Sequence, residues 1–314
     1  MQLRAYFEAQ GFIEAETPML VPATSLEPHI DPIHASVSLQ QDAPAETRFL
    51  HTSPELALKR VLAQTSLKKI YQISKVFRDG ECGPMHRPEF TLLEWYRVDA
   101  PLETLMADCE AIMRELASAL ELHLPAIQKP FERHSLATLF ETYAHIDLMD
   151  VLRRMNEGES NALVTDAQKQ GLVLRPGADF EDAFFHIMGT RIETAVGLTA
   201  PAFITGWPAQ MAVLAERDPR EPLLASRFEL YFHGLELANA FHELRDPKEQ
   251  RQRFESDNRK RVTMGKSPLP MDDDFLEDLN HLPNCSGIAM GMDRLLMALY
   301  QTHQIKDVAG LAWR

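Results

Sequence analysis

Charged side chains concentrate in one stretch of this sequence, between two apolar runs that suit strands. Gln72–Phe77 alternates as a strand does, and Glu89–Arg97 is rich in Phe, Leu, Trp and Tyr. Asp79–Gly80 and Gly83–Pro84 mark a long turn between them. We therefore expect two antiparallel strands joined by a wide loop, although a solvated hairpin would carry charge as well. The functional side chains at the two strand ends are Arg78, Glu81, His86, Arg87, Glu89, Glu94 and Tyr96.

A later stretch, RFELYFHGLELANAFHEL, carries two glutamates that a hairpin would bring together. His233–Gly234 is typical of a two-residue hairpin turn, which would pair Tyr231 with Glu236 and Glu229 with Ala238. Because side chains alternate along a strand, Glu229 and Glu236 would lie diagonally on one sheet face, roughly 7–8 Å apart at the backbone. Two carboxylates this close repel each other unless a cation lies between them, and Mg²⁺ prefers such oxygen ligands. An exposed sheet face is the alternative.

Glu243 and Glu55 are further carboxylates whose roles depend on local structure. Simple alternation puts Glu243 on the face opposite Glu236, so one site can include both only if the strand twists, bulges or ends near residue 240. Ser53 suits a helix N-cap and Pro54 the first helical position, which predicts that a helix begins here. Glu55 in its first turn would complement the helix dipole, or alternatively point at a substrate ammonium.

The elements that must position these residues are helices and strands in mixed order. Helices are predicted at residues 2–10, after residue 53, at 102–122, 136–143, 162–170, 183–196 and 246–264, and after Arg294. Besides the two hairpins, strands are predicted at residues 12–16 and 202–205, with short strands and loops over 22–48.

Composition sets the broad class of the protein. The 314 residues carry 32 basic and 46 acidic side chains, for a formal net charge of −14. The dense basic run Arg251–Arg261 falls inside a predicted helix, and we interpret it as a solvated helix face. Because nucleic-acid binders usually show a basic footprint, a large tRNA-binding surface is not expected. No apolar run approaches the ~20 residues of a membrane span, and the three separated cysteines (Cys82, Cys109, Cys285) favour a reducing cytoplasm.

The stretch VFRDGECGPMHRPEFTLLEWYR resembles motif 2 of the class II aminoacyl-tRNA synthetases, in which an FRxE-like strand end and an (H)xPEFT strand flank a loop. Residues 2–18, a helix and strand closing on Pro18, resemble motif 1, and GIAMGMDR at 287–294 resembles motif 3. Together with SPE at 53–55 and ELANAFHEL at 236–244, these motifs most resemble those of the lysyl branch of the class. The resemblance implies an α+β fold, with a class II catalytic domain built as an antiparallel sheet flanked by helices.

A lysyl-tRNA synthetase carries an anticodon-binding barrel ahead of motif 1, whereas this chain begins directly at motif 1. We therefore expect residues 1–314 to form a single class II synthetase-like catalytic domain without an anticodon-binding domain. The chain is similar to a stand-alone paralogue family, the elongation factor P–(R)-β-lysine ligases. This resemblance implies that it activates lysine or (R)-β-lysine with ATP as an adenylate and transfers it to a lysine of elongation factor P.

The resemblance also assigns a nucleotide site by position. Arg78 would hold the substrate carboxylate and the α-phosphate, Arg294 would meet the γ-phosphate, and both would be catalytic. Phe90 would stack on adenine, while Glu229 and Glu236 would hold Mg²⁺. The ATP-binding residues implied in this way are Arg78, Asp79, Gly80, His86, Arg87, Phe90, Glu236, Leu237, Gly291 and Arg294, with Glu89 nearby.

An amino-acid site follows from the same comparison. Glu55 would take the amino group at the reactive end, whereas Tyr96 and Glu243 would grip the distal ammonium. The residues implied for this site are Ser53, Pro54, Glu55, Tyr96, Glu243 and Ala289. Ala289 replaces the middle glycine of the lysyl-tRNA synthetase string, as it does in the paralogue family. One methyl group there could disfavour α-lysine, an effect worth about 1–3 kcal/mol.

Two positions in the loop depart from the motif, since Gly80 stands where FRxE has Glu and Arg87 where HNPEF has Asn. These changes would loosen or rewire the contacts of the loop with ATP. Ala240 also replaces a usual glycine.

Two other functions remain open on the sequence. One is a truncated lysyl-tRNA synthetase-like ligase that acts on tRNA or on a small amine, and the other is a catalytically inactive regulatory paralogue. An inactive copy should have lost charged ATP ligands, yet Arg78, Glu229, Glu236 and Arg294 are present. The motif 1 resemblance implies a homodimer through residues 2–18. The cysteines and the lack of a long apolar run predict a cytoplasmic protein without a membrane partner.

Overall fold

The computed structural model describes residues 2–38 and 44–309. The chain forms two compact units. The first unit comprises Met1–Leu105 and His242–Arg314, and the second comprises Met106–Phe241. Each unit contains strands and helices of its own, and each contains some of the residues named in the sequence analysis.

Four strands of the first unit neighbour one another in the order β1, β5, β6 and β11. Their bounds are Ile13–Glu14 (β1), Lys69–Phe77 (β5), Glu89–Val98 (β6) and Cys285–Gly291 (β11). β1 runs parallel to β5, whereas β5, β6 and β11 pair antiparallel. The predicted pair of antiparallel strands with a wide loop is therefore confirmed.

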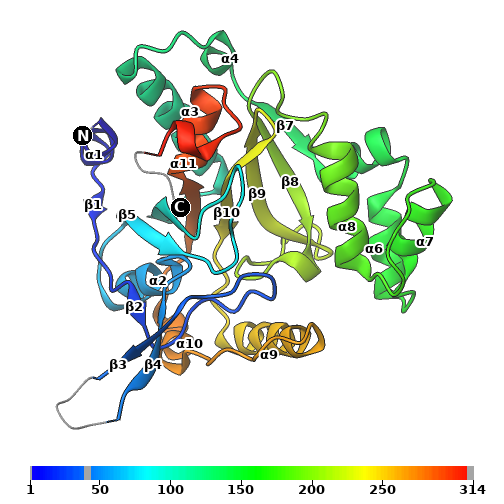
Figure 1. The fold of residues 1–314 in the computed structure, drawn as a ribbon, viewed down its shortest axis with the longest axis horizontal. Helices are drawn as coiled ribbons and strands as arrows, with labels where there is room; N and C mark the ends of the chain where they lie inside the picture. The colour runs from blue at the N-terminus through cyan, green and yellow to red at the C-terminus, as the bar shows by residue number, and fades with distance from the viewer. Residues whose placement is uncertain (1, 39–43, 310–314) are drawn as a thin grey trace. The chain divides into compact units, whose positions relative to one another are not determined.

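Five α-helices and a small second sheet also belong to the first unit (Figure 1). The helices are α1 (Gln2–Ala9), α2 (Glu55–Gln64), α9 (Pro247–Thr263), α10 (Asp273–Asp278) and α11 (Met292–Leu299), and the small sheet orders β2 (Leu20–Val21), β4 (Glu46–Leu50) and β3 (His34–Val37). The ring of Phe7 on α1 stacks on Tyr71 at 4.3 Å between centroids and meets the edge of Trp95 at 5.7 Å. This aromatic packing fixes α1 against β5 and β6.

Helix α9 begins and ends where the sequence predicts. The side chain of Asp246 caps it by accepting hydrogen bonds from the backbone nitrogens of Lys248 and Glu249, at 2.8 and 3.2 Å. Gly265 follows its last turn with a φ of +77°, a conformation that favours glycine.

The interpretation of the basic run on α9 as a solvated face is wrong at its end. Arg261 is only 3% exposed, and its Nη2 donates to Asp31 Oδ1 at 2.7 Å while Nη1 donates to the backbone oxygen of Ile30 at 2.9 Å. Arg251 also pairs within the unit, at 2.6 Å from Asp273. The end of the run at Arg261 therefore makes buried internal contacts, whereas Arg251 and Arg259 remain exposed on the helix surface.

The second unit has its own mostly antiparallel strands, in the order β10, β9, β8 and β7. They are β10 (Leu235–His242, whose last residue belongs to the first unit), β9 (Leu224–Phe232), β8 (Ala202–Pro208) and β7 (Glu132–Ser135). The helices are α4 (Pro125–Gln128), α5 (Leu136–Leu139), α6 (Leu148–Asn156), α7 (Ala162–Lys169) and α8 (Phe180–Ile187), while α3 (Leu102–Ala119) enters this unit from the first. Figure 1 shows α6, α7 and α8 on one side of β8 and β9, and their apolar faces share a core with Ile204 and Trp207 of β8.

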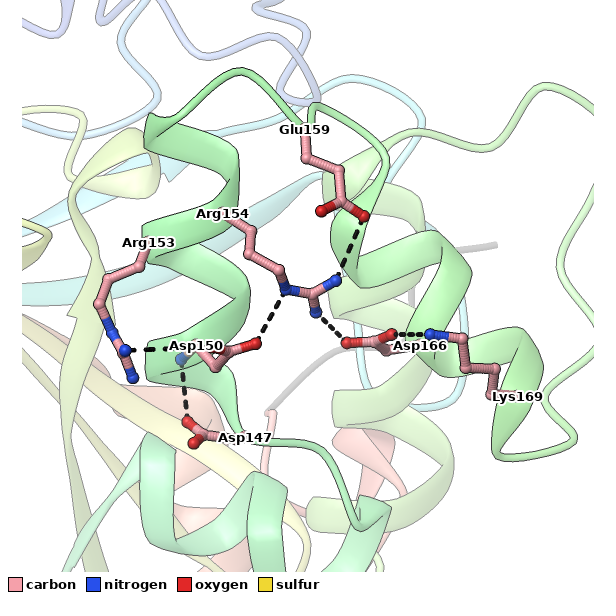
Figure 2. Close-up of polar contacts among 7 residues, drawn as sticks. All are labelled: Asp147, Asp150, Arg153, Arg154, Glu159, Asp166 and Lys169. Atoms are coloured by element: carbon pink, nitrogen blue, oxygen red, sulfur yellow. Dashed lines mark hydrogen bonds and ion pairs between the residues drawn. The ribbon is translucent and has the colours of Figure 1, made fainter.

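An ion-pair network joins α6 to α7 on the outside of this core (Figure 2). The Arg154 guanidinium donates to Asp150 at 2.8 Å, to Glu159 at 3.2 Å and to Asp166 of α7. Lys169 donates to the other oxygen of Asp166 at 2.9 Å. Arg154 therefore binds two helices together by charge while their apolar sides pack inward.

Candidate active site

The β5–β6 loop places a guanidinium over an aromatic ring in the first unit. Arg78 lies with its guanidinium carbon 5.1 Å from the centroid of Phe90, and its Nη1 is 3.6 Å from Glu81 Oε1. The backbone nitrogen of Arg78 donates to Pro88 across the hairpin at 2.8 Å. Its Nε is buried and has no hydrogen-bond partner within residues 2–38 and 44–309. Buried donors are normally paired, so this atom is a candidate for binding an anion.

A second arginine meets the same loop from helix α11. Arg294 Nη2 donates to His86 Nε2 at 2.5 Å. Because arginine keeps its protons, His86 accepts through Nε2 and is the neutral tautomer. The carboxylate of Asp293 accepts a hydrogen bond from the backbone nitrogen of Thr91 at 2.8 Å, which ties the start of α11 to β6. The predicted residues His86 and Arg294 are thus brought together.

The loop backbone explains one departure from the family motif. Gly80 has a φ of +75°, which glutamate would adopt only with strain. Its nitrogen donates to Asp79 Oδ1 at 2.9 Å, and the nitrogen of Asp79 donates to the backbone oxygen of Asp31 at 2.7 Å. The predicted residues Asp79 and Gly80 therefore form a defined turn, while Arg87 is half-buried in the same loop.

Residues at the start of α2 and on β6 form the first part of a carboxylate cluster. Ser53 Oγ donates to Glu94 Oε1 and accepts from the backbone nitrogen of Glu55 at 3.0 Å. Tyr96 donates to the other oxygen of Glu94 in a long hydrogen bond of 3.4 Å. The prediction of Ser53 as the N-cap is wrong by one residue, because Pro54 occupies that position. Ser53 still satisfies the first turn, since its hydroxyl reaches the nitrogen of Glu55.

A buried lysine joins two further members of the cluster. Lys59 Nζ lies 2.5 Å from Glu55 Oε1 and 2.5 Å from Glu243 Oε2. The side chains of Lys59 and Glu243 are each 1% exposed, and that of Glu55 is 13% exposed. We call Glu55, Glu94, Glu243 and Lys59 the carboxylate cluster. Three acids thus surround one base, so the cluster carries excess negative charge when all four groups are ionised.

The pKa shifts in the cluster follow from burial and from this imbalance. Burial, followed by the charge of the nearby Glu55 carboxylate, raises the pKa of Glu94 to about 8, while the hydrogen bond from Ser53 opposes the shift. Burial alone would lower the pKa of Lys59, but the carboxylates of Glu243 and Glu55 outweigh it and raise the pKa. Lys59 therefore stays charged, whereas Glu94 holds a proton near neutral pH until a further cation arrives.

Gly287 on strand β11 leaves space for side chains at the carboxylate cluster. The register of β6 and β11 sets Gly287 beside Tyr96 and Ala289 beside Glu94. A methyl group on Gly287 would lie 2.6 Å from Tyr96 Cδ1 and would also collide with Glu243. A glycine is therefore required at position 287 to leave room for the side chains of Tyr96 and Glu243. At Gly291, by contrast, a methyl group would meet only Arg294 Cβ, at 3.9 Å.

The proposed metal ligand Glu229 lies in the second unit within a polar network of its own. Glu229 is 4% exposed; Arg227 Nη2 donates to its Oε1 and Tyr231 donates to its Oε2 at 2.6 Å. The Arg227 guanidinium also stacks on Trp207 at 4.3 Å and donates to Met211. Burial, followed by the charge of Glu236, raises the pKa of Glu229 to about 8.

The hairpin that carries Glu229 differs from the prediction in its register. The turn is confirmed, because His233 and Gly234 both have positive φ and Glu236 pairs with Tyr231. The predicted pairing of Glu229 with Ala238 is wrong. A bulge between Glu236 and Ala238 shifts the strand, so Glu229 pairs with Asn239 instead. Leu237, predicted to contact ATP, lies at this bulge and is 2% exposed.

Glu229 and Glu236 are the residues that would hold a magnesium ion if one binds together with a nucleotide. The described ranges contain no group of three or more histidine, cysteine or carboxylate side chains able to hold a metal. Mg²⁺ is commonly bound by one or two carboxylates plus substrate phosphates, so Glu229 and Glu236 are sufficient for that arrangement. A buried carboxylate with a raised pKa also favours a cation beside it.

Sequence reasoning missed Lys59 and Arg227, and it named Glu94 as a functional side chain at a strand end without placing it in a site. Lys59 follows Glu55 by four positions, a spacing that places both on one helix face and could have revealed the pair. Glu94 precedes Tyr96 by two positions on one strand, so the two side chains share a face. Arg227 has the same relation to Glu229. The contact between Lys59 and Glu243, which are far apart along the chain, had no such local signal.

Comparison with known families agrees with this architecture. The family model for class II tRNA synthetases of the D, K and N type matches residues 1–312. The fold and the arginines of the β5–β6 loop and of α11 therefore belong to a class II synthetase catalytic domain, and the protein is an ATP-dependent ligase.

Curated relatives define the family more closely. The proteins of Vibrio atlanticus (strain LGP32), Haemophilus ducreyi and Pectobacterium atrosepticum are 36, 34 and 37% identical to this chain. Each alignment covers 98% of this chain and 91, 89 and 90% of the relative, respectively. All three bear the name elongation factor P–(R)-β-lysine ligase. This chain belongs to that family of class II synthetase relatives.

None of the helices in residues 2–38 and 44–309 combines the length and the apolar character needed to span a bilayer.

Proposed function

We propose that this enzyme activates a lysine-type amino acid, preferably (R)-β-lysine, with ATP and transfers it to a lysine side chain of elongation factor P. The observation that carries the proposal is the carboxylate cluster, in which three buried or half-buried acids surround one lysine. Such excess negative charge favours a ligand with more than one ammonium group. A buried substrate cation needs a paired carboxylate, and Glu243 and Glu94 can supply one.

Activation requires the substrate carboxylate to attack the α-phosphate of ATP. A bond forms between the carboxylate oxygen and phosphorus, and pyrophosphate leaves with the electrons of the broken P–O bond. Arg78, with its buried and unpaired Nε, would stabilise the charge on the phosphoryl oxygens, and Arg294 would bind the terminal phosphate. Mg²⁺ held by Glu229 and Glu236 would neutralise further phosphate charge. Phe90, already packed on Arg78, would offer its ring to the adenine.

Transfer requires the neutral amine of an acceptor lysine to attack the carbonyl carbon of the adenylate. An amide bond forms, AMP leaves and the amine loses a proton. A protein acceptor is favoured over tRNA because the net charge is −14, and because Arg261 at the end of the basic run on α9 is buried in internal contacts. Phosphate contacts dominate the affinity for nucleic acid and need free basic groups.

The preference for β-lysine rests on Ala289. Its position beside Glu94 on the neighbouring strand puts one additional methyl group next to the carboxylate cluster. A change of one carbon in a site shifts discrimination by about 1–3 kcal/mol. The methyl group would disfavour the α-amine and favour the shifted amine.

A homodimer formed through the N-terminal segment is part of the proposal. Exposed apolar residues include Ile13 (50%) within residues 2–18, and Met19 (46%) and Leu20 (38%) directly after it. Ile13 belongs to β1, which ends the order of strands in the first unit and so offers an open edge. A second copy would cover these side chains. The three free cysteines agree with a cytoplasmic enzyme.

The acceptor can be tested by intact-mass spectrometry. The purified enzyme is incubated with ATP, labelled lysine or (R)-β-lysine, and either elongation factor P or bulk tRNA. We expect a single lysyl-sized addition to elongation factor P that requires ATP, is larger in yield with β-lysine and is absent with the Glu243→Gln enzyme. Efficient charging of tRNA, with elongation factor P unmodified, would support the truncated synthetase instead.

A further inference from the structure

Lys59 is the one member of the carboxylate cluster with a positive charge. Its Nζ lies 2.5 Å from an oxygen of Glu55 and 2.5 Å from an oxygen of Glu243, so these two oxygens are no more than about 5 Å apart. Glu55 belongs to the same helix as Lys59, whereas Glu243 follows β10 in a distant part of the sequence. The ammonium thus draws together the two carboxylates to which the family resemblance assigns the two amino groups of the substrate.

We propose that Lys59 is a positioning and specificity-determining residue, whose ammonium fixes the spacing and the charge of the two carboxylates that receive a diamino acid. The inference rests on the proposed function and extends it to a residue that would not itself react. Charge balance supports it once the arriving substrate cation has displaced the proton from Glu94. Three carboxylates and one lysine then leave two negative charges, the number that two substrate ammonium groups neutralise. Without Lys59 the same substrate would leave one carboxylate uncompensated.

The position of Lys59 also favours this role over a purely structural one. A buried ion pair is a weak source of stability, because desolvation offsets much of the attraction. Lys59 is 1% exposed, and its ammonium pairs with Glu55 and Glu243. Glu94, which accepts a hydrogen bond from Ser53, lies close to this group. Moving Glu55 or Glu243 by part of an ångström would change how far apart the two ammonium sites lie. Discrimination between α- and β-lysine depends on that spacing.

The test compares three variants in amino-acid-dependent ATP–pyrophosphate exchange. Lys59→Met removes the charge and keeps an unbranched side chain, while Lys59→Arg keeps the charge on a wider planar group. Arg154→Met is the matched control, because it removes a cation from the ion-pair network of Figure 2 in the second unit. KM is measured for L-lysine, for (R)-β-lysine and for ATP, at a temperature where every variant is folded.

For Lys59→Met we expect KM for the amino acids to rise about tenfold or more, with KM for ATP unchanged within about twofold. The ratio of kcat/KM for β-lysine to kcat/KM for α-lysine should change in both Lys59 variants. The same ratio should stay unchanged in Arg154→Met. If Lys59→Met does not fold, Lys59→Arg decides by the same ratio. Unchanged amino-acid KM and an unchanged ratio in a folded Lys59 variant would overturn the inference. A wild-type enzyme that activates neither lysine isomer would instead overturn the proposed function.

Discussion

Replacing Gly287 by alanine tests how the protein makes room for its carboxylate cluster. The new methyl group would lie 2.6 Å from Tyr96 Cδ1 and would also overlap Glu243 Oε1. Tyr96 is 2% exposed and Glu243 is 1% exposed, so neither side chain can move into solvent. The φ of Gly287 lies outside the left-handed region, so alanine suits its backbone and the effect is purely steric.

The expected cost of this substitution is about 1–3 kcal/mol of unfolding free energy, which is typical for inserting a methyl group into a packed core. For a chain of this size that is a decrease in Tm of roughly 2–5 °C, measured by scanning calorimetry. Because Tyr96 and Glu243 must shift, KM for the amino acid should also rise about tenfold while KM for ATP changes little.

Gly291→Ala provides the comparison on the same strand. Its methyl group would meet only Arg294 Cβ, at the ordinary contact distance of 3.9 Å. We expect its stability to change by no more than about 0.5 kcal/mol. Equal stability and equal amino-acid KM for Gly287→Ala and wild type would refute the steric argument, and with it the placement of Tyr96 and Glu243 beside this glycine.

Four further predictions follow from the same geometry. Glu236→Gln should abolish ATP–pyrophosphate exchange in a folded protein, and normal exchange would contradict the metal assignment. Because Glu94 and Glu229 have pKa values of about 8 against an ordinary 4.5, the folded state binds more protons between those pH values. The free energy of unfolding should therefore fall by a few kcal/mol from pH 5 to pH 8, and a flat calorimetric profile would refute this. Ala289→Gly should improve the use of α-lysine by about tenfold in exchange assays. Light scattering at micromolar concentration should give a dimer, and a fully active monomer would exclude one.

The elements that local chemistry determines were the easiest to predict. The β5–β6 pair follows from alternation and aromatic content, and α9 from its Asp246 cap and its Gly265 stop. The turn at His233–Gly234 follows from its residues, but the bulge after Glu236 does not. A bulge depends on how the strand packs against its neighbours, so the pairing of Glu229 could not be derived from alternation.

The site was predictable where the family motifs carry it, and less so where distant residues meet. Arg78, His86 and Arg294 lie in motif positions, and the structure pairs the last two. The role of Lys59 depends on its contact with Glu243, which only the folded chain creates. The burial of Arg261 at the end of α9 could not be predicted for the same reason, because its partner Asp31 lies in a remote part of the sequence.

The central claim is that a cluster with excess buried negative charge selects a substrate with two ammonium groups. It is tested most directly by ATP–pyrophosphate exchange with a series of amino acids of matched size. We expect exchange with (R)-β-lysine and, more weakly, with L-lysine, and none above background with norleucine, which lacks the distal ammonium. Exchange with norleucine equal to that with either lysine isomer would contradict the claim.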